Sequence, residues 1–141
     1  MTSPSPGAPA RGPADTEPLL VLIVDDNEKN LKLARDVLGA AGFRTLEANS
    51  GAEGMALAAE RLPDVILMDL RLPDMDGTEA ARKLRIGART ARIPIVALSA
   101  LPLGGGGDWL IAAGFAGYLE KPIRVGEFPD QVRGYCVRSR G

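Results

Sequence analysis

The feature that most constrains the fold of this chain is a regular alternation, starting at Leu19, between short apolar runs and longer amphipathic segments. The first run, 19–24, is continuous and rich in branched side chains, as is typical of a strand buried on both faces. The segment after it repeats its apolar residues at the spacing of a helix. Five such runs alternate with five such segments, which predicts an α/β fold with a parallel sheet covered by helices on both faces.

Local signals place the ends of these elements. Asn27 can cap the first helix, which ends at Gly42, and Ser50 with Glu53 forms a capping box for the second helix. The expected strands are 19–24, 43–48, 65–68, 93–98 and 115–119, and the last three expected helices are 76–86, 108–113 and 127–137. We expect a doubly wound, flavodoxin-like sheet in the order 2-1-3-4-5, which is taken from known folds of that kind.

Residues 1–18 differ in composition from the rest of the chain. They hold five of the eleven prolines, and no large apolar residue follows Met1 in this stretch. Such a segment cannot bury enough apolar surface to offset the entropy lost on ordering. We therefore predict a disordered Pro-rich tail over 1–18 and one folded domain over 19–141.

The composition also excludes several classes of function. The chain has 17 Lys and Arg against 18 Asp and Glu, so it lacks the positive excess that drives binding to nucleic acid. The absence of histidine and the single Cys136 exclude a Cys/His zinc site, an internal disulfide and a Ser-His or Cys-His catalytic pair. The apolar runs are far shorter than the roughly 20 residues of a membrane span, and no signal-peptide pattern opens the chain. We expect a soluble, cytoplasmic protein.

Polar residues follow four of the predicted strands, at the edge where sheets of this kind bind ligands. Asp25 and Asp26 follow the first strand, Asp69 the third, Ser99 the fourth and Lys121 the fifth. In the order above, the first and third strands are neighbours, so the three carboxylates meet. Because clustered carboxylates repel unless a cation holds them, and because the donors are all oxygens, Mg²⁺ is the expected ion. Taken alone, each residue also has a simpler interpretation as a helix cap, a strand-end hydroxyl or a surface charge.

Four motifs that contain these residues resemble the receiver domains of two-component response regulators. The resemblance extends from about Leu19 to near the end of the chain, in particular to single-domain regulators of the cell-cycle type and to receivers attached to hybrid kinases. The motifs are Val24-Asp25-Asp26-Asn27, the run from Leu67 to Gly77, Ala97-Leu98-Ser99-Ala100 and the run from Gly117 to Ile123.

The resemblance implies a role for each residue at the strand ends. Asp69 would accept a phosphoryl group from a phosphohistidine on a histidine kinase or a histidine phosphotransfer protein. Ser99 would hydrogen-bond that group, Lys121 would pair with it, and Tyr118 would turn inward when Ser99 moves. The Mg²⁺ ligands would be Asp25, Asp26, Asp69 and the backbone carbonyl of Arg71. The chain would catalyse only its own phosphorylation and dephosphorylation.

The sequence leaves other functions open to different degrees. A phosphohydrolase of the haloacid dehalogenase type, with Asp69 as nucleophile, needs an acidic residue two positions later, where this chain has Arg71. A receiver that drains a kinase as a phosphate sink, or one cut from a hybrid kinase, has the same residues as a signalling receiver. Because the sequence stops soon after the last predicted helix, we expect output through contacts with a downstream effector protein.

Two backbone features complete the expectations. The resemblance implies a cis Lys121-Pro122 peptide bond, which is accessible at a cost of about 0.5–1 kcal/mol. The glycines at 104–107 disfavour helix, so we predict a mobile link followed by a short helix that Asp108 caps and Gly114 ends.

Overall fold

The computed structural model describes residues 18–100 and 107–140, with side chains up to Cys136. The predicted disordered tail, apart from Pro18, and positions 104–106 of the predicted mobile link lie outside the described residues. The elements in chain order are β1 (Leu20–Val24), α2 (Glu28–Ala40), β2 (Arg44–Ala48), α3 (Gly51–Arg61), β3 (Val65–Asp69), α4 (Gly77–Ile86), β4 (Ile95–Ser99), α5 (Asp108–Ala112), β5 (Gly117–Glu120) and α6 (Phe128–Arg140). None of the helices in these described ranges is long and apolar enough to cross a membrane.

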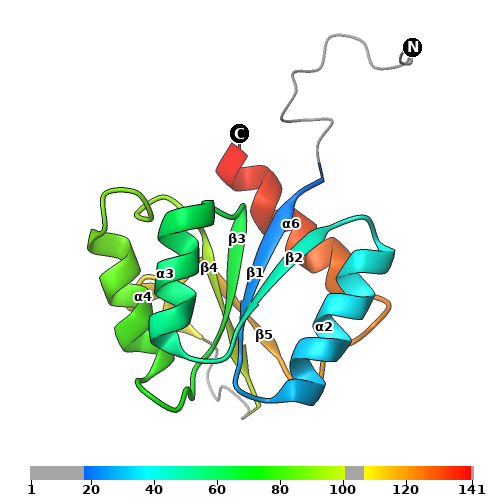
Figure 1. Cartoon of the computed structure of the whole chain (residues 1–141), viewed down its shortest axis with the longest axis horizontal. Helices are drawn as coiled ribbons and strands as arrows, with labels where there is room; N and C mark the ends of the chain where they lie inside the picture. Colours follow the sequence, from blue (N-terminus) through cyan, green and yellow to red (C-terminus); the bar gives the residue numbers. More distant parts are fainter. Residues whose placement is uncertain (1–17, 101–106, 141) are drawn as a thin grey trace, which may run out of the picture.

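The five strands form one parallel sheet in the order β2-β1-β3-β4-β5, as the sequence predicts. Helices α3 and α4 cover one face of the sheet, while α2 and α6 cover the other (Figure 1). Neighbouring residues of a strand point to opposite faces, so Leu22 and Val24 pack beside α3 whereas Val21 and Ile23 pack beside α2. Burial on both faces explains why the central strands are continuous apolar runs.

The strand register brings the carboxyl ends of the central strands to one edge of the sheet. Val24 pairs with Met68, Asp69 with Leu98, and Ser99 with Glu120. The residues that follow β1, β3, β4 and β5 therefore emerge side by side, although they are far apart in the sequence.

The predicted caps of α2 and α3 are present. The Asn27 side chain accepts hydrogen bonds from the amides of Lys29 and Asn30 at 2.9 and 3.1 Å. The Ser50 hydroxyl accepts from the Glu53 amide at 3.1 Å, but the Glu53 carboxylate reaches the amide of Asn49 instead of that of Ser50. The first half of the capping box is therefore confirmed, and the second half is shifted by one residue.

The short helix α5 is present, but its predicted cap is wrong. The N-cap is Gly107, and Asp108 is the first helical residue. Gly107 is buried against the ring of Tyr118, where no larger residue fits. Gly114, at φ +107°, ends the helix as predicted, because a residue in the left-handed region lets the amides of Gly114 and Phe115 reach carbonyls of the last turn.

Two strands begin two residues later than predicted. Strand β4 starts at Ile95 because Pro94 has no amide to donate, although its carbonyl accepts from Ile66 at 2.9 Å. Strand β5 starts at Gly117 because the Phe115 amide bonds to Leu110 at the end of α5. Ile93 and Phe115, where these two strands were predicted to begin, are buried in the core without being part of a strand.

Candidate functional site

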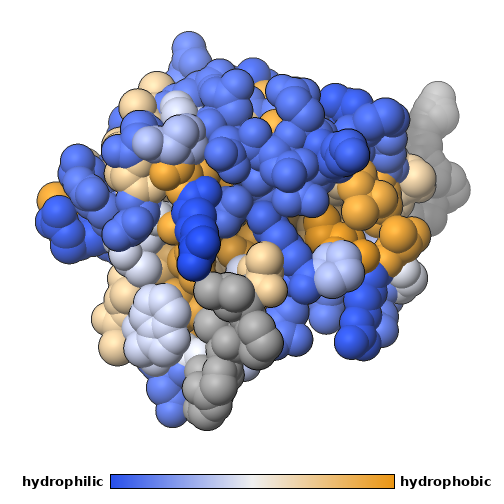
Figure 2. Space-filling model, turned by 90° about the horizontal axis from the view of Figure 1, so that it is seen from below, coloured by the Kyte–Doolittle hydropathy of each residue, from blue (hydrophilic) through white to orange (hydrophobic). Residues whose placement is uncertain are grey.

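A cleft of about 390 Å³ opens at the carboxyl edge of the sheet. It lies among the ends of β1, β3, β4 and β5, and the face of the molecule at this end is mainly hydrophilic (Figure 2). Its lining includes five predicted site residues, Asp26, Asp69, Arg71, Ser99 and Lys121. The sheet topology therefore gathers side chains from four separate segments into one site.

Asp25 is completely buried beneath this cleft, and each of its carboxylate oxygens has a donor. Its Oδ1 accepts from the Asn27 amide at 2.9 Å. Its Oδ2 accepts from Lys121 Nζ at 2.8 Å and from Asn30 Nδ2 at 3.3 Å. A buried carboxylate is costly unless it is paired and hydrogen-bonded, and these contacts meet that requirement.

Asp69 ends β3 with both of its side-chain oxygens held from opposite sides. The Arg71 amide donates to Oδ1 at 3.0 Å, and Lys121 Nζ donates to Oδ2 at 3.1 Å. Burial raises the pKa of Asp69, and the nearby charge of Asp25 adds to this, while the Arg71 amide and Lys121 oppose it without cancelling it. Burial is thus the largest influence on the Asp69 pKa, and a cation nearby would favour the charged form of this carboxylate.

Lys121 brings one cation to these carboxylates. Burial alone would lower its pKa, but the hydrogen bond and charge of Asp25, together with the charge of Asp69, raise the pKa above its ordinary value. Lys121 therefore stays charged at neutral pH and holds the end of β5 against those of β1 and β3.

The three carboxylates form a set that fits a hard divalent ion. Asp25, Asp26 and Asp69 each offer an oxygen, and these oxygens lie within 4.8 Å of one another. Asp26 is exposed whereas Asp25 is buried, so the cluster opens toward the cleft. An all-oxygen set with room for water suits Mg²⁺, which keeps several waters when it binds to proteins.

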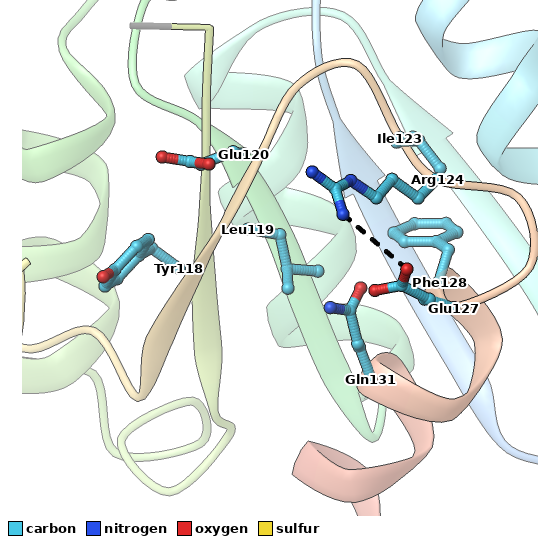
Figure 3. Close-up of a pocket in the computed structure, with 8 residues that line it drawn as sticks. All are labelled: Tyr118, Leu119, Glu120, Ile123, Arg124, Glu127, Phe128 and Gln131. Atoms are coloured by element: carbon cyan, nitrogen blue, oxygen red, sulfur yellow. Dashed lines mark ion pairs between the residues drawn. The ribbon is translucent and has the colours of Figure 1, made fainter. Parts of the chain in front are cut away.

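Ser99 and Tyr118 occupy different places relative to the cleft. Ser99 ends β4, is 5% exposed and lines the cleft, and its carbonyl accepts from the Lys121 amide at 2.7 Å. Tyr118 is half-buried and packs on the face of the sheet that α3 and α4 cover. Tyr118 also lines a second groove, which runs between β5 and α6, and Figure 3 shows its ring pointing away from Leu119 and Gln131 of the same groove. Ser99 is thus in the cleft and Tyr118 is beside it.

Two contributors to the site were not assigned a site role from the sequence. Asn30 lines the cleft from the first turn of α2 and donates a hydrogen bond to Asp25, and its sequence signal is its place in the run 25–30 that resembles the receiver motif. Asp74 lies in the loop that follows β3, and its carboxylate accepts from the amides of Gly51 and Ala52 at the start of α3. The predicted cis Lys121-Pro122 bond is confirmed.

Comparison with known proteins agrees with this geometry. The family model of the response regulator receiver domain matches residues 21–133. The polar-differentiation response regulator DivK of Brucella ovis is 38% identical over 115 residues, which cover 82% of this chain and 94% of the relative.

Solved structures show the same fold. The receiver domain of the sensor histidine kinase PA1611 of Pseudomonas aeruginosa, described with a magnesium ion coordinated in its active site cleft, is 32% identical with a TM-score of 0.76 and covers 85% of this chain and 98% of its own. The chemotaxis protein CheY4 of Vibrio cholerae is 26% identical with a TM-score of 0.78 and covers 84% and 98%. With its 2-1-3-4-5 sheet and acidic cleft, this chain belongs to the receiver-domain family of two-component response regulators.

Proposed function

We propose that this chain accepts a phosphoryl group on Asp69 from the phosphohistidine of a histidine kinase or a histidine phosphotransfer protein, in a Mg²⁺-dependent reaction. It then signals through contacts with a downstream effector protein. The observation that carries the proposal is the position of Asp69, at the end of the central strand β3 in a cleft where Lys121 and two further carboxylates meet. The likeness to DivK, a response regulator, supports the same function.

The proposed step is the transfer of a phosphoryl group between two side chains. An Asp69 carboxylate oxygen attacks the phosphorus, the P–O bond to Asp69 forms, and the P–N bond to the donor imidazole breaks. The imidazole takes up a proton as it leaves. Such a reaction depends on positioning and on stabilising charge rather than on acid–base groups of the acceptor.

Lys121, Ser99 and Tyr118 each have a part in this proposed step. Lys121 Nζ, already 3.1 Å from Asp69 Oδ2, pairs with the phosphoryl oxygens. The Ser99 hydroxyl donates a hydrogen bond to the same group, and this draws Ser99 toward it. Tyr118 moves into the space that Ser99 leaves. The reaction thus couples the cleft to the face of the sheet on which Tyr118 packs.

Asp25, Asp26, Asp69 and the backbone carbonyl of Arg71 are the proposed Mg²⁺ ligands. A Mg²⁺ ion held by these residues would neutralise the negative charge that the carboxylates and the phosphoryl oxygens bring together. The charge of Asp25 beside Asp69 supports this, because it adds to the effect of burial in raising the Asp69 pKa, and a cation in the cluster would offset that repulsion. The magnesium ion coordinated in the active site cleft of the PA1611 receiver domain supports a Mg²⁺ site in the cleft of this chain.

The test is transfer of labelled phosphate from a phosphorylated histidine kinase to the full chain. We expect label on the wild type with Mg²⁺, none after chelation, and none on Asp69→Asn. Asp36→Asn, which changes an exposed carboxylate on α2 that pairs with Lys32, is the matched control and should be labelled like the wild type. Labelling of Asp69→Asn at the wild-type rate would contradict the proposal.

A further inference from the structure

The loop between β3 and α4 is attached to a helix that precedes it in the chain. Both carboxylate oxygens of Asp74 accept hydrogen bonds from the first amides of α3, from Gly51 at 2.8 Å and from Ala52 at 2.9 Å. These amides have no partner within their own helix, because the first turn of a helix leaves its donors free. Asp74 therefore caps α3 from a loop more than 20 residues away.

Asp74 and its neighbour Met75 hold the tip of this loop together. A Cβ atom at Gly51 would lie 2.6 Å from Met75 Cγ, so the Met75 side chain lies directly on the glycine. Gly51 thus lies against the Met75 side chain and donates its amide hydrogen to the Asp74 carboxylate. The tip of the loop has a defined position relative to α3.

The base of the same loop adjoins the phosphoacceptor. The Arg71 amide donates to Asp69 Oδ1 at 3.0 Å, and the Gly77 amide donates to the Leu70 carbonyl at 2.9 Å. The backbones of Arg71 and Asp76 also form an isolated antiparallel β-bridge across the loop. Gly77 packs so tightly on the Asp69 carbonyl that a Cβ atom there would clash with it. The base of the loop is thus hydrogen-bonded to and packed directly against Asp69.

We propose that Asp74 is a positioning residue for phosphoryl transfer, because its attachment to α3 holds the Arg71 amide against Asp69 Oδ1. This inference rests on the proposed function of Asp69. Without Asp74, the tip loses its two hydrogen bonds to α3 and keeps only apolar contacts such as that of Met75, so that the Arg71 backbone moves relative to the carboxylate. A displacement of about 1 Å can slow an enzyme-type reaction by up to roughly 100-fold.

The experiment compares two variants at Asp74 with one at a neighbouring cap. Asp74→Ala removes both acceptor oxygens, and Asp74→Asn keeps one. Ser50→Ala is the matched control, because the Ser50 hydroxyl caps the same end of α3 by accepting from the Glu53 amide of that helix. Each protein is phosphorylated with acetyl phosphate at saturating Mg²⁺, and the initial rate is measured.

A second readout uses no metal and no phosphate. Amide NMR spectra and hydrogen exchange of the metal-free proteins follow the Arg71 amide. We expect Asp74→Ala to shift this amide signal, to speed its exchange and to slow phosphorylation about tenfold, within the range for small misplacements. Asp74→Asn should recover part of both effects. Ser50→Ala should lower the melting temperature while it keeps the wild-type rate and Arg71 signal.

The outcomes separate the inference from the function on which it rests. Asp74→Ala with the wild-type rate and an unchanged Arg71 signal would overturn the positioning role, as would a Ser50→Ala protein that slows equally. Wild-type protein that takes no phosphate would instead overturn the proposed function of Asp69. In that case the Arg71 signal of the metal-free variants still decides whether Asp74 holds the loop.

Discussion

Single residues of the acidic cluster differ in what they do for the metal-free fold. Asp25 is fully buried and is bound by Lys121, Asn27 and Asn30, so its carboxylate is part of the packing at the end of β1. Asp26 is exposed and lines the cleft. Removal of Asp26 therefore tests ion binding with little effect on packing.

We expect Asp26→Ala to weaken Mg²⁺ binding by more than about tenfold, since loss of even an outer partner of a metal site costs about 10–100-fold. The metal-free melting temperature should stay the same or rise, because one of three repelling carboxylates is gone. Titration calorimetry and thermal unfolding in chelator measure the two quantities. A lowered melting temperature with unchanged Mg²⁺ affinity would show that Asp26 is structural.

Asp74 makes the stability of the chain depend on pH. The amides of Gly51 and Ala52 hold the pKa of this exposed carboxyl below its usual range. An acid whose pKa is lower in the folded state stabilises the fold above its unfolded pKa, about 3.9, and loses this effect as the pH falls through the folded value. We expect the wild type to unfold at a higher temperature than Asp74→Asn at pH 7, with the difference shrinking below about pH 4. A difference that is the same at pH 7 and pH 3 would contradict this linkage.

At the scale of elements, α5 depends on contacts made outside itself. It has five residues, and Leu110 is its buried apolar residue. The Arg85 guanidinium of α4 donates to the carbonyls of Gly114 and Ala91, and this ties the end of α5 to the loop before β4. So short a helix is not stable by propensity alone. Its start is set by Gly107 under the Tyr118 ring.

Gly107→Ala should therefore push Tyr118 or the start of α5 out of place. Overpacking of this kind costs about 1–3 kcal/mol of unfolding free energy. The control is Gly134→Ala on the exposed side of α6, where a Cβ atom meets nothing within 4 Å. That control should gain about 0.5–1 kcal/mol, because alanine is the better helix former. Denaturant unfolding and the ring resonances of Tyr118 measure the outcome, and an unchanged ring signal with wild-type stability would contradict it.

At the scale of the whole molecule, the site exists only when the sheet is complete. Lys121 joins Asp25 and Asp69 although it lies 96 and 52 residues from them in the sequence. An ion bound by such a set binds the folded chain and not the unfolded one. It therefore adds its binding free energy to global stability.

Mg²⁺ should accordingly raise the unfolding free energy by about 2.7 kcal/mol at a free concentration of roughly 100 times Kd. Thermal unfolding across a Mg²⁺ series measures this, with Asp26→Ala as the variant in which the rise falls to about half or less at the same Mg²⁺ concentration. Stabilisation of Asp26→Ala equal to that of the wild type would place the ion elsewhere on the chain.

The amino-acid sequence by itself determined the α/β fold, the caps at Asn27 and Ser50, and the position of the acidic residues at the strand ends. These follow from local patterns, because apolar periodicity and caps act within one element. The strand order was taken from known doubly wound folds, the cis Lys121-Pro122 bond came from the family resemblance, and the assigned roles of Asp69, Ser99 and Lys121 stay predictions. Only the tertiary structure decided the partner of Asp74, which lies 23 positions away at Gly51, and the cap of α5, where the Tyr118 ring requires Gly107. Both depend on which surfaces meet when the helices pack on the sheet, and no local pattern encodes that meeting.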